Sequence, residues 1–236
     1  MRIAAASGLI LALLLPAPPV LAAPAAPVVV ELFTSQGCNS CPPADALLQK
    51  LAARPDVLAL GFHVDYWNYL GWPDTLALHA ATERQQAYAK ALGEGYVYTP
   101  EMVIAGAAAV LGSDPGAVDK AIAKAAAAPR SVALRVTGQA GGTLTLDVPA
   151  GTATASTLWL IGYDAEEKIA IKAGENAGHT IDYVDAVRVI RHLDSWSGQA
   201  ARIALPPAGL KGATHWAVLL QQGGDGPILA AIRLPD

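Results

Sequence analysis

Cys38 and Cys41 are the only two cysteines in the chain, and the two residues between them allow a single short-range disulfide. Pro42 and Pro43 follow at once; proline lacks an N–H and is best tolerated in a first helical turn. The N–H groups and the dipole at the start of a helix favour a thiolate. The pattern predicts an exposed, acidified thiol at Cys38 with Cys41 more sheltered, as thiol–disulfide exchange requires.

Two other roles for this cysteine pair are alternatives. A purely structural bridge would close a very short loop, to which the chain-entropy model assigns little stabilisation. Two thiolates can also hold Cu(I), whereas zinc would require four Cys or His ligands. The five histidines show no paired spacing, so we expect no metal site. His63 and Met102 would be the first additional ligands to consider.

Two acidic residues are candidates for moving a proton. Glu31 lies inside an apolar run, and a buried carboxylate with a raised pKa would act as a proton relay at neutral pH. The alternative for Glu31 is an ion pair with a surface Lys or Arg. Asp65 follows a second apolar run, at the strand end where open α/β sheets hold their sites. An Asp at this position is also typical of a turn cap.

An aromatic loop follows Asp65 and contains Tyr66, Trp67, Tyr69 and Trp72. These rings could wall a groove beside Cys38 that holds an extended apolar peptide. The alternative is that they seal the core of the protein. We take Trp67 and Tyr66 as the candidates for positioning a substrate.

The elements that would hold these residues alternate between strands and helices in the first half of the chain. Residues 28–33 are a short run rich in β-branched side chains, as in a strand covered on both faces. After the cysteines, apolar residues recur at helical spacing. Further strands are predicted over 57–64, 102–105 and 108–111, and the last two form a hairpin. A helix is predicted over 76–92. Another helix is predicted to start with Asp114 as its N-cap and Pro115 in the first helical position.

The second half of the chain has a different pattern, and an alanine-rich stretch before Arg130 marks the change. Short alternating apolar runs separated by Gly, Pro and Asn predict a β-rich unit over residues 131–236, a smaller all-β, sandwich-like domain. The glycine-bounded loop 174–178 is predicted to be a turn, and a hairpin tip that reaches Cys38 is its alternative. We expect this unit to present or recognise a partner.

Residues 1–23 are predicted to be a signal peptide, with a positive Arg2, an apolar core over 9–15 and a small-residue cleavage site. The apolar run is too short for a membrane span, and an uncleaved anchor is the alternative. No later stretch is predicted to cross a bilayer, so we expect an exported protein, periplasmic or secreted. The chain is 53% hydrophobic with a net charge of -4 and has no basic patch, which argues against nucleic acid as a partner.

The order of elements, the Cys38-Asn39-Ser40-Cys41 motif and a Thr99-Pro100 step before the third strand resemble the thioredoxin fold. The resemblance implies that Pro100 is cis and packs against the disulfide, and that the Thr99 backbone pairs with an extended substrate. Thioredoxins also carry a buried acid six residues before the first cysteine. Glu31 lies seven residues before Cys38, an offset that one extra loop residue could absorb or that could turn the side chain to the other face.

More closely, the chain is similar to the secreted bacterial family known as domain of unknown function 1223. The family resemblance implies no established activity. It rests on four stretches of the first half, which are 30–38 with 40–45, Phe62-His63-Val64-Asp65-Tyr66-Trp67, Leu70-Gly71-Trp72 and 97–103.

These observations predict an α/β thioredoxin-like domain over residues 27–128, a mixed sheet flanked by helices with a helical insertion, followed by the β-rich unit. The predicted function is that of an exported thiol–disulfide oxidoreductase that acts without a cofactor on a protein or small-molecule thiol or disulfide. Cys38 would attack and Cys41 would resolve the mixed disulfide, with Thr99 and Pro100 holding the partner. The alternative is a binding or Cu(I)-delivery module on the same fold.

Overall fold

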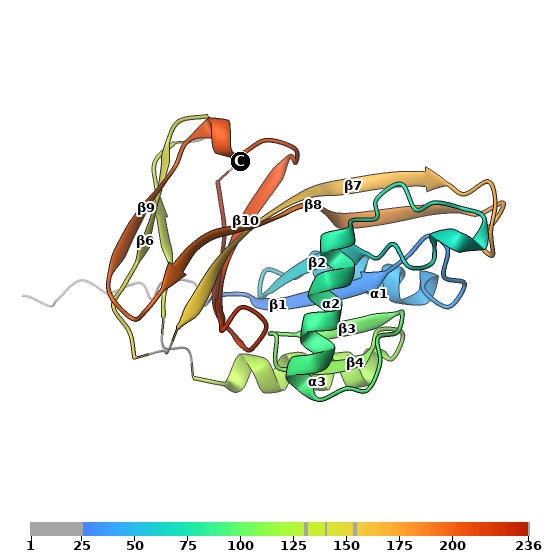
Figure 1. Ribbon diagram of the computed structural model, residues 1–236, viewed down its shortest axis with the longest axis horizontal. Coiled ribbons are helices and arrows are strands. Elements are labelled where there is room, and N and C mark those ends of the chain that lie inside the picture. Colours follow the sequence, from blue (N-terminus) through green and yellow to red (C-terminus); the bar gives the residue numbers. More distant parts are fainter. Residues whose placement is uncertain (1–25, 130–131, 140, 153–154, 236) are drawn as a thin grey trace, which may run out of the picture.

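The computed structural model describes residues 26–129, 132–139, 141–152 and 155–235. The predicted signal peptide, residues 1–23, lies outside this part. A mixed sheet of eight strands runs through the protein in the order β11-β10-β7-β8-β2-β1-β3-β4 (Figure 1). Its strands are β1 Val28–Thr34, β2 Val57–His63, β3 Glu101–Ile104, β4 Ala108–Leu111, β7 Ser156–Ala170, β8 Thr180–Trp196, β10 His215–Gln222 and β11 Ile228–Arg233.

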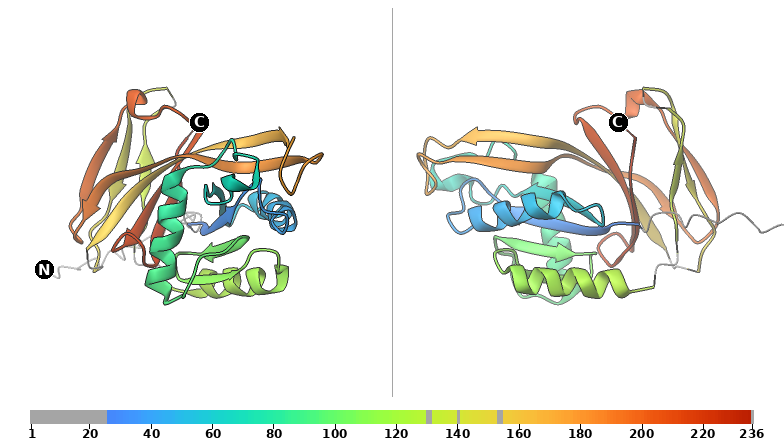
Figure 2. Two further views of the ribbon diagram at one scale, coloured as in Figure 1. Left: turned by 45° about the vertical axis from the view of Figure 1, so that its right-hand side comes forward. Right: turned by 180° about the vertical axis from the view of Figure 1, so that it is seen from behind.

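Helices cover both faces of the first part of this sheet. They are α1 Pro42–Ala52, α2 His79–Leu92 and α3 Pro115–Ala127, with a short 3-10 helix η1 at Asn68–Leu70. Alternate residues of β1 divide between the two faces, because side chains of a strand point to opposite sides in turn. Val30 and Leu32 pack with α1 and α3, whereas Val29 and Phe33 pack with α2. Figure 2 shows α1 and α3 together on one face and α2 on the other.

The local expectations for the first half are confirmed with small shifts of boundary. β1 and β2 are parallel, and every residue of both is buried. β3 and β4 form the predicted hairpin. The helix expected from residue 76 begins at His79. The third helix begins as predicted, with Asp114 accepting a hydrogen bond from the Ala117 N–H and Pro115 in the first position.

The second half is β-rich as predicted, but most of it continues the first sheet. β8 pairs in parallel with β2 through Gly61 and Ala186, and β7, β10 and β11 follow beyond it. A separate sheet contains only β5 Arg135–Thr137, β6 Leu144–Val148 and β9 Ala201–Leu205 among the described residues. It packs over the far end of the large sheet, where Leu146 shares one apolar cluster with Val218. The hydrogen-bonded sheet therefore crosses the boundary expected after residue 128, and the protein is a mixed α/β structure.

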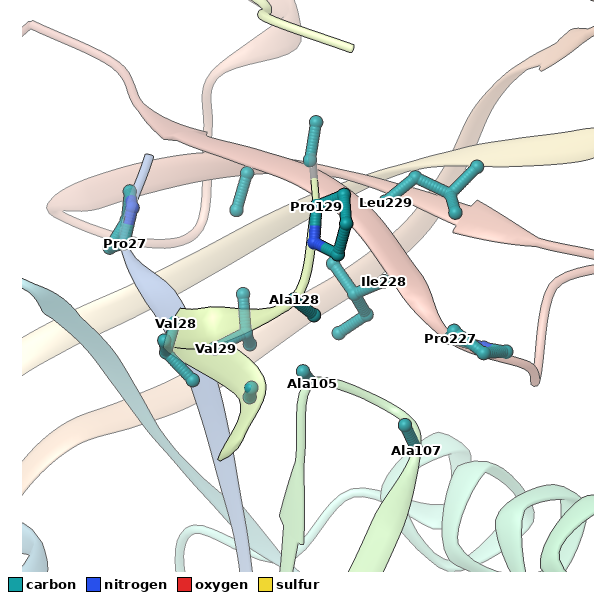
Figure 3. A pocket seen from close by; sticks show the side chains of 13 residues that line it. Pro27, Val28, Val29, Ala105, Ala107, Ala128, Pro129, Pro227, Ile228 and Leu229 are labelled. Carbon is teal, nitrogen blue, oxygen red and sulfur yellow. The ribbon is translucent and has the colours of Figure 1, made fainter. Parts of the chain in front are cut away.

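A small apolar pocket of about 180 Å³ lies at the N-terminal end of β1, where it meets the end of α3 and the start of β11 (Figure 3). The described residues that line it are all Pro, Val, Ala, Ile or Leu. The cysteines follow the opposite end of β1, so this pocket is separate from the candidate site.

The turn between β3 and β4 joins the two halves of the chain through a backbone hydrogen bond. The Ala105 carbonyl accepts a hydrogen bond from the Ile228 N–H at 2.8 Å. Gly106 has a φ of 62°, and a Cβ there would collide with the Gly226 carbonyl. We expect Gly106→Ala to lower the free energy of unfolding by about 2 kcal/mol, from backbone strain and the forced displacement of this contact. Urea unfolding measures the change.

Gly95→Ala is the matched control, because its added Cβ would meet no atom within 4 Å. It should change the free energy of unfolding by less than about 0.5 kcal/mol. Equal effects of the two substitutions would show that the contact between the halves does not depend on a missing side chain.

Candidate functional site

Cys38 and Cys41 form a disulfide with their Cα atoms 5.4 Å apart. The Cys41 N–H donates to the Cys38 carbonyl at 3.2 Å, which closes a turn between them. Helix α1 begins only at Pro42, and Cys41 is its N-cap. The expectation that Cys38 lies at the helix start is therefore wrong. The prolines occupy the first helical turn, so the positive end of the helix lies at the second cysteine.

The exposure of the cysteines also differs from the prediction. Cys38 is 4% exposed and Cys41 is fully buried, while Asn39 and Ser40 between them are exposed. The order is as expected, with Cys41 the more sheltered, but Cys38 is covered rather than open. The Ser40 hydroxyl lies 3.3 Å from the Cys38 sulfur. Ser40 can therefore donate a hydrogen bond to the sulfur.

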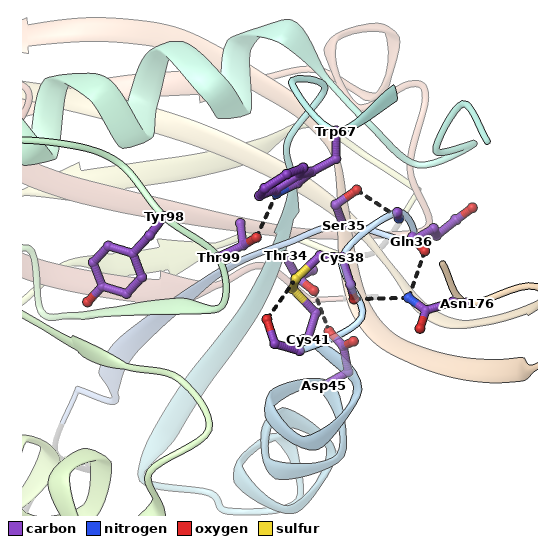
Figure 4. The surroundings of a disulfide bond; sticks show 12 residues. Thr34, Ser35, Gln36, Cys38, Cys41, Asp45, Trp67, Tyr98, Thr99 and Asn176 are labelled. Atoms are coloured by element: carbon purple, nitrogen blue, oxygen red, sulfur yellow. Dashed lines mark hydrogen bonds between the residues drawn. A yellow bond between two sulfur atoms is a disulfide. The ribbon is translucent and has the colours of Figure 1, made fainter. Parts of the chain in front are cut away.

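The structure brings Thr99, Pro100 and Trp67 to this disulfide. The Thr99–Pro100 peptide is cis, and the Trp67 indole N–H donates to the Thr99 hydroxyl at 2.7 Å (Figure 4). A Cβ on Gly112 would lie 3.3 Å from both the Pro100 Cβ and the Ala44 Cβ. Pro100 is thus adjacent to the first turn of α1. Both cysteines lie just before that turn.

Tyr66 and Asp65 face α2 instead. The Tyr66 hydroxyl donates to the Gln85 side chain at 3.1 Å. Asp65 accepts from the Thr82 hydroxyl at 2.6 Å and lies 2.8 Å from His79 Nδ1. The Thr82 hydrogen bond and His79 lower the pKa of Asp65. A carboxylate with a lowered pKa does not suit a proton relay at neutral pH, and Asp65 instead joins the aromatic loop to α2.

Glu31 points away from the cysteines. It lies on the face of β1 that packs on α2, whereas Leu32 lies on the face that packs on α1. Its Oε1 accepts from Arg84 Nη2 at 2.8 Å and from Nε at 3.1 Å, and both side chains are buried. The Arg84 guanidinium also lies over the rings of Tyr88, Trp159 and Phe62. Glu31 therefore forms an ion pair, as in the alternative considered for it, but its partner arginine is buried and does not lie at the surface.

A different acid lies beside Cys41. Asp45 is one helical turn beyond it, and the Asp45 N–H donates to the Cys41 carbonyl at 3.1 Å. The Thr34 hydroxyl donates to Asp45 Oδ1 at 2.8 Å, while Oδ2 is buried with no hydrogen-bond partner in the described part of the chain. Burial raises the pKa of Asp45 to about 7, although the charge of His63 acts in the opposite direction.

His63 and Asp74 complete this buried polar cluster on the α1 face. His63 Nδ1 lies 2.8 Å from Asp74 Oδ2, and the His63 ring meets the edge of Tyr183 at 4.7 Å between centroids. Burial opposes ionisation of Asp74, but His63 and the N–H groups of Gln36 and Leu76 outweigh it and lower the pKa. The cluster therefore holds one stable carboxylate, Asp74, and one carboxyl group that titrates near neutrality, Asp45.

Sequence analysis missed Asp45 although a signal was present. Residues four apart on a helix share a face, so the spacing of Cys41 and Asp45 was enough to place them as neighbours. An acidic residue in a first turn is, however, also common for its interaction with the helix dipole. That ordinary role hides the special one until the burial of Asp45 is known.

Asn176 brings the second half of the chain into the site. Its amide Nδ2 donates to the Gln36 and Cys38 carbonyls, each at 2.9 Å (Figure 4). It lies in the glycine-bounded loop at the tip of the β7–β8 hairpin, for which contact with Cys38 was the alternative to an isolated turn. The structure supports that alternative.

In the described residues no three His, Cys, Asp or Glu side chains gather as metal ligands. Of the two additional ligands considered for a metal, His63 is bonded through Nδ1 to Asp74, and Met102 packs in the apolar core. Over the same residues, no helix is long and apolar enough to cross a membrane.

A family model described as protein of unknown function, DUF1223, matches residues 29–221. The chain belongs to this family. The crystal structure of protein AGR_C_4864 from Agrobacterium tumefaciens is similar, with 35% identity, a TM-score of 0.78, and coverage of 90% of this chain and 96% of that one. HBP35 of Porphyromonas gingivalis shares the fold at 16% identity and a TM-score of 0.55, over 89% of this chain and 74% of that one. The comparison with curated proteins found no significant match.

The raised pKa of Asp45 predicts how stability depends on pH. Its folded pKa of about 7 lies above the unfolded value. The folded protein therefore binds more protons between these values, and stability falls as pH rises from about 4 to 7. We expect Asp45→Asn to remove this loss, so that the variant gains roughly 3 kcal/mol relative to the wild type between pH 4 and pH 8. Denaturant unfolding of the oxidised proteins across this range measures the gain.

Asp119→Asn is the control, because the Asp119 side chain is 64% exposed. Its effect on unfolding should be nearly independent of pH over this range. A difference between Asp45→Asn and wild type that stays constant from pH 4 to pH 8 would contradict a raised pKa.

Proposed function

We propose that this family member is an exported thiol–disulfide oxidoreductase whose first half, residues 27–128, is thioredoxin-like. The observation that carries the proposal is the Cys38–Cys41 disulfide with Asp45 buried one turn beyond it. A dithiol beside a group that can accept and return a proton at neutral pH meets the basic needs of exchange chemistry. The order from β1 to α3, with Thr99–Pro100 before β3, supports the fold assignment.

The reaction with a partner disulfide proceeds in two exchanges. The Cys38 thiolate attacks one partner sulfur, forms a mixed disulfide and releases the other partner sulfur as a thiolate. The Cys41 thiol then loses its proton to Asp45 and attacks the Cys38 sulfur. This step forms the Cys38–Cys41 disulfide and releases the second partner thiolate. Two electrons pass from the protein dithiol to the partner, and the two released thiolates take up protons.

The reverse sequence oxidises a partner dithiol. A partner thiolate attacks Cys38, and Cys41 leaves as a thiolate that receives the proton from Asp45. The second partner thiol then loses its proton and attacks the partner sulfur bound to Cys38, which releases Cys38 and closes the partner disulfide. Relative reduction potentials decide which direction operates.

Cys38 is the sulfur that meets the partner, because Cys41 is fully buried and Cys38 retains 4% exposure next to two exposed residues. The Ser40 hydroxyl can donate to a Cys38 thiolate. Asp45 takes the proton-transfer role that sequence analysis gave to Glu31. Glu31 is committed to Arg84 on the opposite face.

The surface around Pro100 suits an extended partner chain. Two of the large apolar side chains that remain exposed, Tyr69 at 75% and Tyr96 at 73%, belong to loops that contain Trp67 and Thr99. Leu111, 49% exposed, precedes Gly112, whose N–H donates to the Pro100 carbonyl at 3.0 Å. Exposed apolar groups gathered in this way are typical of an interaction site. A protein thiol or disulfide in an extended segment fits this surface, as does a smaller thiol.

Substitution of the cysteines tests the enzymatic assignment. Wild-type protein should reduce insulin in the presence of dithiothreitol, and Cys38→Ser should abolish the gain over the uncatalysed rate because no attacking sulfur remains. Cys41→Ser should instead accumulate a mixed disulfide with the partner, visible by non-reducing electrophoresis and mass spectrometry.

The same assay with a small disulfide, oxidised glutathione, covers partners that insulin does not represent. If the wild type is no faster than Cys38→Ser with either disulfide, the enzymatic proposal is wrong. Tight Cu(I) binding by the reduced wild type in that case would favour the delivery module.

Asp45→Asn tests the proton acceptor separately. We expect it to slow resolution of the mixed disulfide about 10-fold at pH 7, because Cys41 then lacks a nearby base. The effect should shrink above about pH 9, where solvent deprotonates the thiol unaided. Asp65→Asn serves as the control and should leave the rate nearly unchanged. A pH-independent loss of rate in Asp45→Asn would indicate a structural role alone.

A further inference from the structure

The β7–β8 hairpin carries a side chain from the second half of the chain to the cysteines. Its strands contain 15 and 17 residues, and the tip lies over the loop that connects β1 to α1 (Figure 1). Asn176, at this tip, is 5% exposed. An amide nitrogen has two hydrogens, and here one is donated to the Gln36 carbonyl and the other to the Cys38 carbonyl.

The loop at residues 36–38 is also hydrogen-bonded to residues 72 and 74. Gln36 accepts from the Trp72 indole at 2.7 Å through its side chain and donates to Asp74 at 2.8 Å through its N–H. Gly174 packs closely on Trp72, since a Cβ at Gly174 would lie 3.1 Å from the Trp72 Cβ. The loop is thus bonded both to the hairpin tip and to the aromatic loop, and these two segments also contact each other. The position of the loop does not depend on the disulfide alone.

The Cys38 carbonyl is the atom group through which the hairpin tip contacts the cysteine pair. It accepts hydrogen bonds both from the Cys41 N–H at 3.2 Å and from Asn176 Nδ2 at 2.9 Å. In the oxidised protein the disulfide itself restrains Cys38. In the reduced protein that restraint is gone, and the hydrogen bonds must keep the two sulfurs adjacent.

We propose that Asn176 is a positioning residue of the redox centre, which keeps Cys38 beside Cys41 after reduction and so stabilises the disulfide relative to the dithiol. The inference rests on the proposed redox role of the pair. Ease of disulfide closure depends on the effective concentration of the two thiols, which rises when the loop between them is held in place. Loss of Asn176 frees the loop chiefly in the reduced state, since the disulfide still restrains the oxidised state. The dithiol then gains entropy and becomes the more favoured form.

The coupling acts in both directions, because linkage between two equilibria is reciprocal. If Asn176 favours the disulfide, the disulfide favours docking of the hairpin tip. Reduction therefore loosens residues 171–179. The docking of the hairpin tip thus depends on whether the Cys38–Cys41 disulfide is formed. A partner that contacts the tip would therefore bind the oxidised and reduced forms differently.

Equilibration with glutathione tests the proposal. The reaction converts one protein disulfide and two glutathione molecules into one protein dithiol and one oxidised glutathione. We expect Asn176→Ala to raise its equilibrium constant about 10-fold, as for the loss of two modest hydrogen bonds. Glu175→Ala, an exposed change at the same tip, is the control and should leave the constant within about two-fold of wild type. Asn176→Ser, which retains one donor, should give an intermediate value.

A role that is merely structural would give a different result. It would lower the stability of the oxidised and reduced forms equally and leave the equilibrium constant unchanged, which would overturn the proposal. Hydrogen exchange on the wild-type protein supplies a second measurement that does not depend on a variant folding. Amides over 171–179 should exchange faster after reduction, whereas unchanged exchange there would also overturn the proposal.

The glutathione equilibrium requires no turnover with a partner, so the two proposals can fail separately. A protein that does not reduce insulin but shows the Asn176 effect would lose the enzymatic assignment and keep the positioning role. If the protein reduces insulin but Asn176→Ala leaves the glutathione equilibrium constant unchanged, the enzymatic assignment stands and the positioning role of Asn176 is wrong.

Discussion

The parallel pairing of β1 and β2 is the constraint on which the candidate site depends. Both strands are buried along their whole length, so their register is set by apolar side chains on two faces at once. They end together, with Thr34 opposite His63. Thr34 donates a hydrogen bond to Asp45, and His63 is hydrogen-bonded to Asp74. The two strand ends therefore place two buried acids on the face that carries α1. The cysteine turn follows directly from one of these ends.

Two buried carboxyl groups, Glu31 on β1 and Asp45 on α1, differ in the partners that compensate for their burial. Glu31 faces Arg84, whose charge compensates for burial and whose guanidinium is itself enclosed by aromatic rings. Removing either partner would leave the other charge buried and unpaired, which is strongly destabilising. Among the described residues Asp45 has a hydroxyl donor but no ion-pair partner at hydrogen-bonding distance, and burial then favours its neutral form. With a pKa of about 7, Asp45 can exchange a proton near neutral pH.

Local features of the fold could be predicted from the sequence, and long-range ones could not. The apolar run at β1, the helix capped by Asp114 and the β3–β4 hairpin all follow from spacing within about ten residues. The junction of β2 with β8 is a parallel pairing between segments more than 100 residues apart, and no turn residue or motif encodes it. The covered position of Cys38 depends on the same tertiary packing. For Glu31, a one-residue offset in an alternating strand decided the face, and the sequence permitted both outcomes.

Asn176 illustrates why the second half of the chain could not be assigned a task from its own residues. Its loop contains no nucleophile and no paired acids, and in isolation it is an ordinary turn between glycines. Its significance arises because two long strands carry it to a carbonyl group next to a sulfur. A hydrogen bond of this kind adds little to global stability. It acts, however, on a group whose mobility differs between the disulfide and the dithiol, and a restraint on such a group shifts the balance between the two forms. The extension of the first sheet by β8 is therefore also the means by which the far half of the protein reaches the two cysteines.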